Sequence, residues 1–204
     1  MERFVMNPPP ERLAPEPGRV LARAGCPKSA GNSLLKPATF AIERLLALAR
    51  PVAFLADLPV LSSDENTIEL EGLTIRSSDM AKKLSGSSFL TIFLATIGPG
   101  PEETCRALSE SGRLTEALLL DAAASEMVEL LLRSAHRQAS LRMSGFIGTA
   151  RYAPGYGDFS LSHQAFIVDA LGGDSTGVMV MKDSYMLVPQ KSTTGVVGWR
   201  KQGR

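Results

Sequence analysis

The ten residues from Arg151 to Ser160, "RYAPGYGDFS", break the regular pattern of this chain. They lie between an apolar, strand-like segment at 145–150, "GFIGTA", and a helix-like segment at 161–171, "LSHQAFIVDAL". Their glycines and proline are typical of a turn. Their two tyrosines, however, can stack on a ring or lie against a cation. Composition alone favours a structural turn with Arg151 in an ion pair over a loop that wraps a ligand.

Each residue of this stretch also suits a ligand loop. Pro154 pushes Ala153 away from helical geometry. Gly155 and Gly157 allow positive φ or a close approach of backbone to a ligand. Arg151 can hold a carboxylate through two parallel hydrogen bonds.

A second glycine-containing segment follows at 186–199, "MLVPQKSTTGVVGW". Three consecutive hydroxyl side chains begin at Ser192, and Gly195 and Gly198 permit close backbone contacts. Taken alone, the segment is interpreted as a loop followed by an edge strand.

Outward from these segments, the pattern predicts a mixture of helices and strands. Helical spacing of apolar residues, with caps and prolines at the ends, predicts helices at 37–51, 78–86, 101–112, 114–139 and 160–171. Apolar or alternating runs predict strands at 52–60, 87–98, 177–181, 185–189 and 194–199 and a hairpin at 67–75. Because these elements do not alternate strictly, we expect an α+β (α/β-like) single domain with a mixed, mostly antiparallel sheet flanked by helices.

The N-terminal residues look different from the rest of the chain. Residues 1–18 hold five of the 13 prolines, which favours an extended arm. We therefore divide the chain into a proline-rich arm at 1–34 and a domain at 35–204.

Bulk composition excludes several classes of function. The 204 residues carry 22 basic and 21 acidic side chains, which gives no electrostatic case for nucleic acid or an anionic membrane. Two distant cysteines indicate neither disulfides nor zinc. With no signal peptide pattern and no apolar run long enough to span a bilayer, a cytoplasmic protein is expected.

No catalytic residue or metal ligand is predicted. The two histidines, His136 and His163, lack ligand-type neighbours, and no nucleophile–base set is present. Acidic residues on the long helix are interpreted as a solvated face, with Glu129 and Arg133 as an i,i+4 ion pair.

Taken in order, the two glycine-containing segments resemble the activation domain of cobalamin-dependent methionine synthase, in its short stand-alone form. The similarity extends over about residues 85–199. It rests on an arginine followed after three residues by Gly-Tyr, continued by Gly-Asp-aromatic, and on a later Met-Leu, proline and Lys-Ser-x-Thr-Gly pattern. The matching residues are Arg151, Pro154, Gly155, Tyr156, Gly157, Asp158, Phe159, Met186, Leu187, Pro189, Lys191, Ser192, Thr194 and Gly195.

The resemblance implies an S-adenosylmethionine groove in which Arg151 holds the ligand's carboxylate and Tyr156 lies near the adenosine or sulfonium. The other implied ligand residues are Ala153, Pro154, Gly155, Ser192, Thr194, Gly195, Val197 and Gly198. It further implies a partner that carries cobalamin, either a methionine synthase or another corrinoid protein, and a flavodoxin- or ferredoxin-like electron donor. In that family the domain supports reductive remethylation of inactive cob(II)alamin.

Two departures from the family keep a second interpretation open. Larger relatives carry a ligand-contacting aromatic residue where this chain has Val197 and Gly198, and their early acidic contact has no counterpart that we can place. The alternative is a non-catalytic docking or scaffold partner of a corrinoid methyltransferase. A third hypothesis, an unrelated small-molecule enzyme, is opposed by the lack of a nucleophile–base set.

Overall fold

The computed structural model describes residues 2–27 and 31–202 and is built around a seven-stranded sheet with the strand order β4-β3-β2-β5-β9-β6. Strand β1 pairs with β2 beside this path, and β7 and β8 form a separate two-stranded sheet. Each pairing between these strands is antiparallel, so the expected α+β fold with a mostly antiparallel sheet is confirmed. The strands are β1 (Arg3–Met6), β2 (Val52–Ser63), β3 (Thr67–Leu70), β4 (Leu73–Arg76), β5 (Phe89–Thr96), β6 (Phe146–Gly148), β7 (Met179–Val180), β8 (Leu187–Val188) and β9 (Ser192–Lys201).

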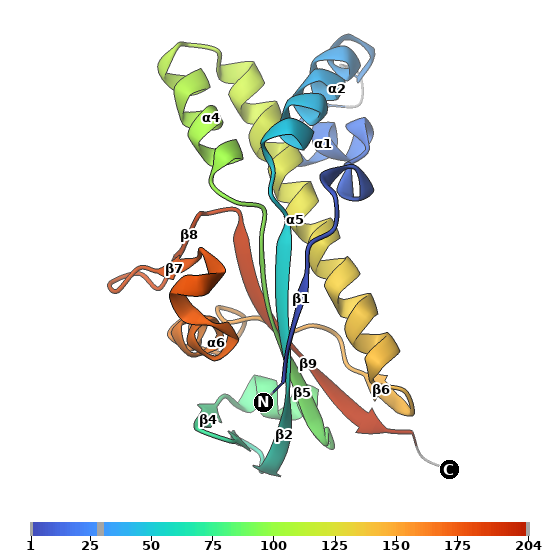
Figure 1. The fold of residues 1–204 in the computed structure, drawn as a ribbon, viewed down its shortest axis with the longest axis vertical. Coiled ribbons are helices and arrows are strands. Elements are labelled where there is room, and N and C mark those ends of the chain that lie inside the picture. Colours follow the sequence, from blue (N-terminus) through green and yellow to red (C-terminus); the bar gives the residue numbers. More distant parts are fainter. Residues whose placement is uncertain (1, 28–30, 203–204) are drawn as a thin grey trace.

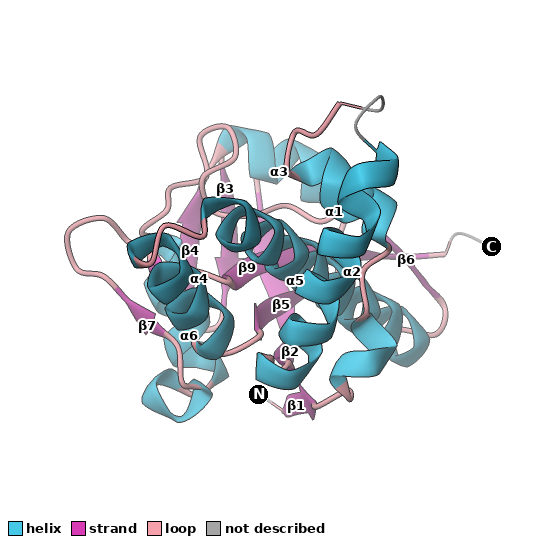
Figure 2. Ribbon diagram, turned by 90° about the horizontal axis from the view of Figure 1, so that it is seen from above, coloured by secondary structure: helices cyan, strands magenta, loops and turns pink. Residues whose placement is uncertain are grey.

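The helices lie on both faces of this sheet (Figures 1 and 2). Helix α5 runs along one face, and α1, α2 and α4 gather around its first half at one end of the molecule, while α6 and the β7–β8 hairpin lie across the sheet from α5 (Figure 1). The helices are α1 (Pro17–Arg23), α2 (Gly31–Leu48), α3 (Ser78–Leu84), α4 (Gly100–Glu110), α5 (Leu114–Arg142) and α6 (His163–Leu171), with 3-10 turns at η1 (Pro10–Leu13) and η3 (Gly173–Thr176). None of the helices in these ranges combines the length and apolar character needed to cross a membrane.

Alternation along β5 produces two separate hydrophobic cores. Phe93 and Ala95 face α5 and its neighbouring helices, whereas Ile92 and Leu94 face α3 and α6. Side chains alternate between the two faces of a strand, so one almost fully apolar strand supplies both cores. This explains why the sequence pattern showed a continuous apolar run there.

The N-terminal residues differ from the separate arm that their prolines suggested. Strand β1 pairs with β2 over Arg3–Met6, and Leu13, Val20 and Leu21 are buried in the core under α5. Arg23 Nε also donates to Glu126 Oε1 of α5 at 2.5 Å. Prolines are compatible with these elements because they occupy the first positions of η1 and α1.

The start of one helix and the cap of another also differ from the sequence-based expectation. Helix α2 begins at Gly31 and carries Pro37 inside it, rather than beginning there. The sequence pattern also predicts Ser78 as the cap of the helix at 78–86, but helix α3 is capped by Ser77, whose hydroxyl accepts a hydrogen bond from the Met80 amide at 3.0 Å. From the sequence alone, two adjacent serines are equally good candidates for the helix cap.

Candidate functional site

The 151–160 segment begins as a short extension of the sheet edge. The Tyr152 amide donates to the Val196 carbonyl at 2.9 Å, and the Val196 amide donates back at 2.7 Å. After Ala153 the chain leaves the sheet at Pro154 and turns. The turn closes where the amide of Gly155, at φ +94°, donates to the Phe159 carbonyl at 2.7 Å.

The Gly-Asp-Phe part of this segment is an anchor. The Asp158 carboxylate accepts hydrogen bonds from the Ser77 and Ser78 hydroxyls and from the Ser78 and Asp79 amides, so it caps α3 from a distance in sequence. These bonds, first that from Ser77, lower the pKa of Asp158 to about 2. Gly157 lies so close to α3 that a Cβ would stand 2.1 Å from Asp79 Oδ2.

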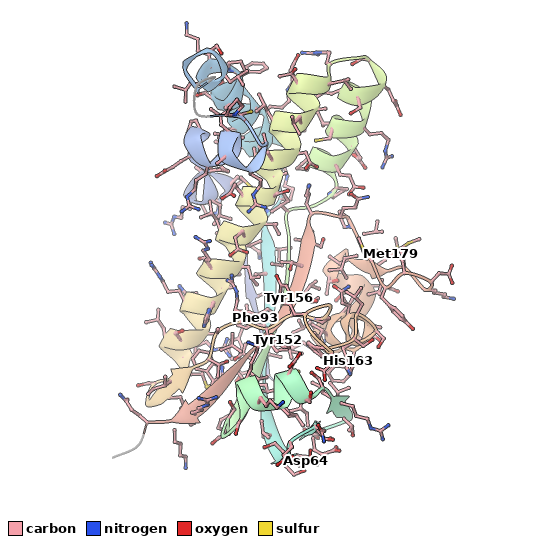
Figure 3. All side chains as sticks on the ribbon, turned by 180° about the vertical axis from the view of Figure 1, so that it is seen from behind. Asp64, Phe93, Tyr152, Tyr156, His163 and Met179 are labelled. Carbon is pink, nitrogen blue, oxygen red and sulfur yellow. The ribbon has the colours of Figure 1, made fainter. Side chains whose placement is uncertain are left out.

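The two tyrosines of this segment differ in their packing and exposure. The Tyr152 ring is buried and stacks on Phe159, with ring centroids 6.0 Å apart. Its hydroxyl donates to the Tyr156 carbonyl at 3.0 Å. The Tyr156 side chain is 63% exposed. Figure 3 shows both tyrosines near the centre of the molecule. Because Tyr152 is only 6% exposed, Tyr156 is the one of the two that a ligand can reach.

The side chains of the Lys-Ser-x-Thr-Gly segment hold the start of β9 in place. Lys191 Nζ contacts Asp121 and Ser125 of α5 at 2.7 and 2.9 Å. The Ser192 hydroxyl donates to Thr96 Oγ1 at 2.8 Å. The Thr194 hydroxyl donates to Gln164 Oε1 of α6 at 3.1 Å. These hydroxyls, expected to be free for a ligand, are therefore engaged within the protein.

What β9 leaves available at this edge is its backbone. Since Val196 exchanges both of its hydrogen bonds with Tyr152, antiparallel alternation turns the amide and carbonyl of Thr194 to the same side, away from β5. Among the described residues no strand pairs with this side of β9 between Ser192 and Gly195. A ligand with donor and acceptor groups can therefore pair with Thr194 as an edge strand would.

Two adjoining cavities flank this open edge. One, of about 380 Å³, lies between α5 and β9; the other, of about 440 Å³, lies on the α6 side. Both are lined by Ala153, Tyr156, Thr193 and Thr194, so we treat them as one groove that crosses the edge of β9. Cavities of a few hundred cubic ångströms accommodate small organic ligands.

Arg151 faces the α5 side of this groove and is already in contact with a carboxylate. Its Nη2 donates to Glu129 Oε1 at 2.7 Å, and Arg133 Nε donates to the same oxygen at 3.1 Å. The predicted Glu129–Arg133 pair is confirmed, and so is the ion pair considered for Arg151. Because Arg151 has five N–H donors, this contact leaves others for a ligand.

His136 lies beside this cluster on α5, between Phe93 and Trp199. Its ring centroid is 6.3 Å from that of Phe93 and 6.1 Å from that of Trp199. Burial, and then the nearby Arg151 charge, lower the pKa of His136. The imidazole is thus neutral near pH 7 and adds no charge to the groove.

Eight of the ten ligand residues proposed from the sequence line the groove, and two lie outside it. Arg151, Ala153, Pro154, Gly155, Tyr156, Ser192, Thr194 and Gly195 line the groove. Val197 and Gly198 lie outside it. Val197 is fully buried in the core under α5, and a Cβ on Gly198 would stand 2.3 Å from Ser87 Oγ. The glycine at 198 is explained by this close approach of the 84–87 loop, not by a ligand.

Several residues that line the groove were not predicted from the sequence as ligand residues. Those on α5 are Glu129, Leu132, Arg133 and His136, and those on the α6 side include Gln164 and Gln190. The α5 residues follow an i, i+3, i+4, i+7 spacing that marks one helix face. The spacing indicates the face but not the neighbour, since only the tertiary fold brings it to Arg151.

Within residues 2–27 and 31–202, no three His, Cys, Asp or Glu side chains gather as a metal site.

Comparison with known proteins identifies the architecture. No protein-family profile matches the chain, and no curated sequence does either. The crystal structure of the MetH reactivation domain bound to AdoHcy matches with a TM-score of 0.73 and 15% identity, covering 100% of this chain and 80% of that chain. This chain has the fold of that reactivation domain.

Proposed function

We propose that this protein binds S-adenosylmethionine in the groove between residues 151–156 and 192–195. The observation that carries the proposal is the coincidence of three features at one sheet edge: an arginine with spare donors, an open stretch of β9 backbone and an exposed tyrosine. The fold supports it, because the neighbour with the same fold holds AdoHcy.

The residues fit the chemistry of this ligand part by part. Arg151 suits the α-carboxylate, the Thr194 amide and carbonyl suit polar groups along the ligand, and the Tyr156 ring suits the adenine or the sulfonium. S-adenosylmethionine supplies an electrophilic methyl group when bound. The contribution of the groove residues to the transfer is orientation of the methyl group toward a partner.

We further propose that the methyl acceptor is the corrinoid of a cobalamin-dependent methionine synthase or a related corrinoid protein. In this role the protein supports reactivation: an electron from a flavodoxin- or ferredoxin-like donor and the methyl group from S-adenosylmethionine restore the methylated corrinoid and leave S-adenosylhomocysteine. The two motifs and the fold of the reactivation domain support this role.

The alternative is a docking partner of a corrinoid methyltransferase without methyl transfer. Two observations favour it. Arg151 already donates a hydrogen bond to Glu129, and Val197 and Gly198 lie outside the groove.

Calorimetric titration with S-adenosylhomocysteine separates the two functions. We expect saturable one-to-one binding, and S-adenosylmethionine-dependent methylation of the cob(II)alamin-loaded partner under a reducing system. A protein that captures the corrinoid partner but takes up neither nucleoside supports the docking function instead.

A further inference from the structure

We propose that Glu129 and Arg133 of α5 complete, with Arg151, a site for the zwitterionic amino-acid end of the ligand. The inference rests on the proposed function and extends it, because it assigns ligand recognition to two residues outside both sequence motifs. The carboxylate would lie between the two guanidinium groups, and the ammonium would lie on Glu129.

The charge balance of the cavity supports an anion there. Arg133 and Arg151 both line the 380 Å³ cavity, and Glu129 is the one acidic residue among those lining it. Because His136 is neutral, the lining carries one positive charge in excess. The ligand carboxylate would pair with the two guanidinium groups and the ligand ammonium with Glu129, so that each charge in this partly buried site has an opposite partner.

The hydrogen-bond geometry leaves room for both ends of the zwitterion. Arg133 Nε at 3.1 Å and Arg151 Nη2 at 2.7 Å meet the same oxygen, Glu129 Oε1. Both pairs run through Oε1, which leaves Oε2 for an ammonium donor. The side chains of Glu129, Arg133 and Arg151 are 32%, 54% and 22% exposed, so solvent and ligand can reach them.

An ordinary helix-surface pair would not produce this arrangement. The i,i+4 contact between Glu129 and Arg133 is common on helices. Here, however, Arg151 arrives from a turn 22 residues away and joins the same carboxylate inside a cavity. Such an Arg–Glu–Arg cluster matches a group that carries one negative and one positive charge close together.

Two probes separate this inference from a structural role. S-adenosylhomocysteine has the amino-acid end, and 5′-methylthioadenosine lacks it while retaining the thioether and adenosine. We expect Arg133→Ala and, separately, Glu129→Gln to weaken calorimetric binding of S-adenosylhomocysteine by about tenfold or more, and to leave 5′-methylthioadenosine within about twofold.

The matched control is Arg137→Ala, one turn further along α5, where the side chain lines neither groove cavity. It should bind both probes as the wild type does. The inference is overturned if Arg133→Ala keeps wild-type affinity for S-adenosylhomocysteine, or if it loses both probes equally. A wild-type protein that binds neither probe overturns the proposed function itself, which is a distinct result.

Discussion

Replacement of Arg151 by alanine gives the sharpest test of the groove. Arg151 contributes one N–H to Glu129 and keeps the others for a bidentate contact with a ligand carboxylate. Each charge-assisted hydrogen bond contributes about 1.5–3 kcal/mol. Because the side chain is 22% exposed, we take about 2–3 kcal/mol for the pair of bonds after solvent screening. The expected loss of affinity is about 30- to 150-fold.

The same substitution should have little effect on the fold. Glu129 retains Arg133 at 3.1 Å, so no carboxylate is left without a partner. A partly exposed ion pair of this kind contributes about 1 kcal/mol or less to the free energy of unfolding. Affinity and stability are therefore predicted to separate, which distinguishes a ligand-holding arginine from one that only secures the turn.

Calorimetric titration with S-adenosylhomocysteine and urea denaturation measure the two quantities on the same samples. Arg151→Lys should fall between wild type and alanine, because lysine keeps the charge but not the planar fork. If Arg151→Ala unfolds at the wild-type urea concentration and its dissociation constant changes by less than about threefold, the assigned role of Arg151 is refuted.

Three further predictions concern the anchor of the turn and the core beneath it. Gly157→Ala should lower the free energy of unfolding by at least about 2 kcal/mol, since it adds a clash with Asp79 to a positive φ; Gly112→Ala, at φ +76° with open space around it, should cost only about 1 kcal/mol in the same denaturation series. Asp158 has a pKa near 2 against an ordinary value of 3.8, so its stabilising contribution is complete above about pH 4 and lost toward pH 2. The gap between wild type and Asp158→Asn in acid-unfolding curves should accordingly close over that range, and a gap that persists to pH 2 would contradict the capping role. Ser87→Ala should be neutral or slightly stabilising in thermal unfolding, because the buried Ser87 hydroxyl forms no hydrogen bond to the described residues.

Periodicity was a sufficient guide where an element buries one clear face. The strand at 52–60, the hairpin at 67–75 and the long helix at 114–139 all appear, with limits shifted by a few residues. Prediction failed where proline dominated composition. Proline restricts φ and removes a donor, but neither property prevents a residue from starting a helix, as Pro10 and Pro17 do. Whether Leu13 and Val20 are buried depends on α5, which lies a hundred residues away.

The sequence indicated most of the stretches that line the candidate groove, but only some of the contacts that their side chains form. The two motifs indicated two stretches of chain that the structure brings together at the edge of β9. The roles of the motif side chains were not predictable, because a hydroxyl such as that of Thr194 serves equally well toward a ligand or toward Gln164. The position of Gly198 outside the groove was not predictable for the same reason, since a glycine permits close approach by any neighbour.

In this groove the side chains of the β9 segment hold the strand in position, and its backbone is left for the ligand. Lys191, Ser192 and Thr194 direct their side chains into the protein and so fix the position of the β9 edge. Recognition is then left to the backbone of that edge and to a few side chains around Arg151. Substitutions in the Lys-Ser-x-Thr-Gly segment should thus weaken ligand binding through displacement of the strand, whereas substitutions in the arginine cluster should weaken it through lost charge. Because salt screens the arginine cluster, the affinity of Ser192 and Thr194 variants should keep the salt dependence of the wild type, whereas variants of the arginine cluster should lose part of it.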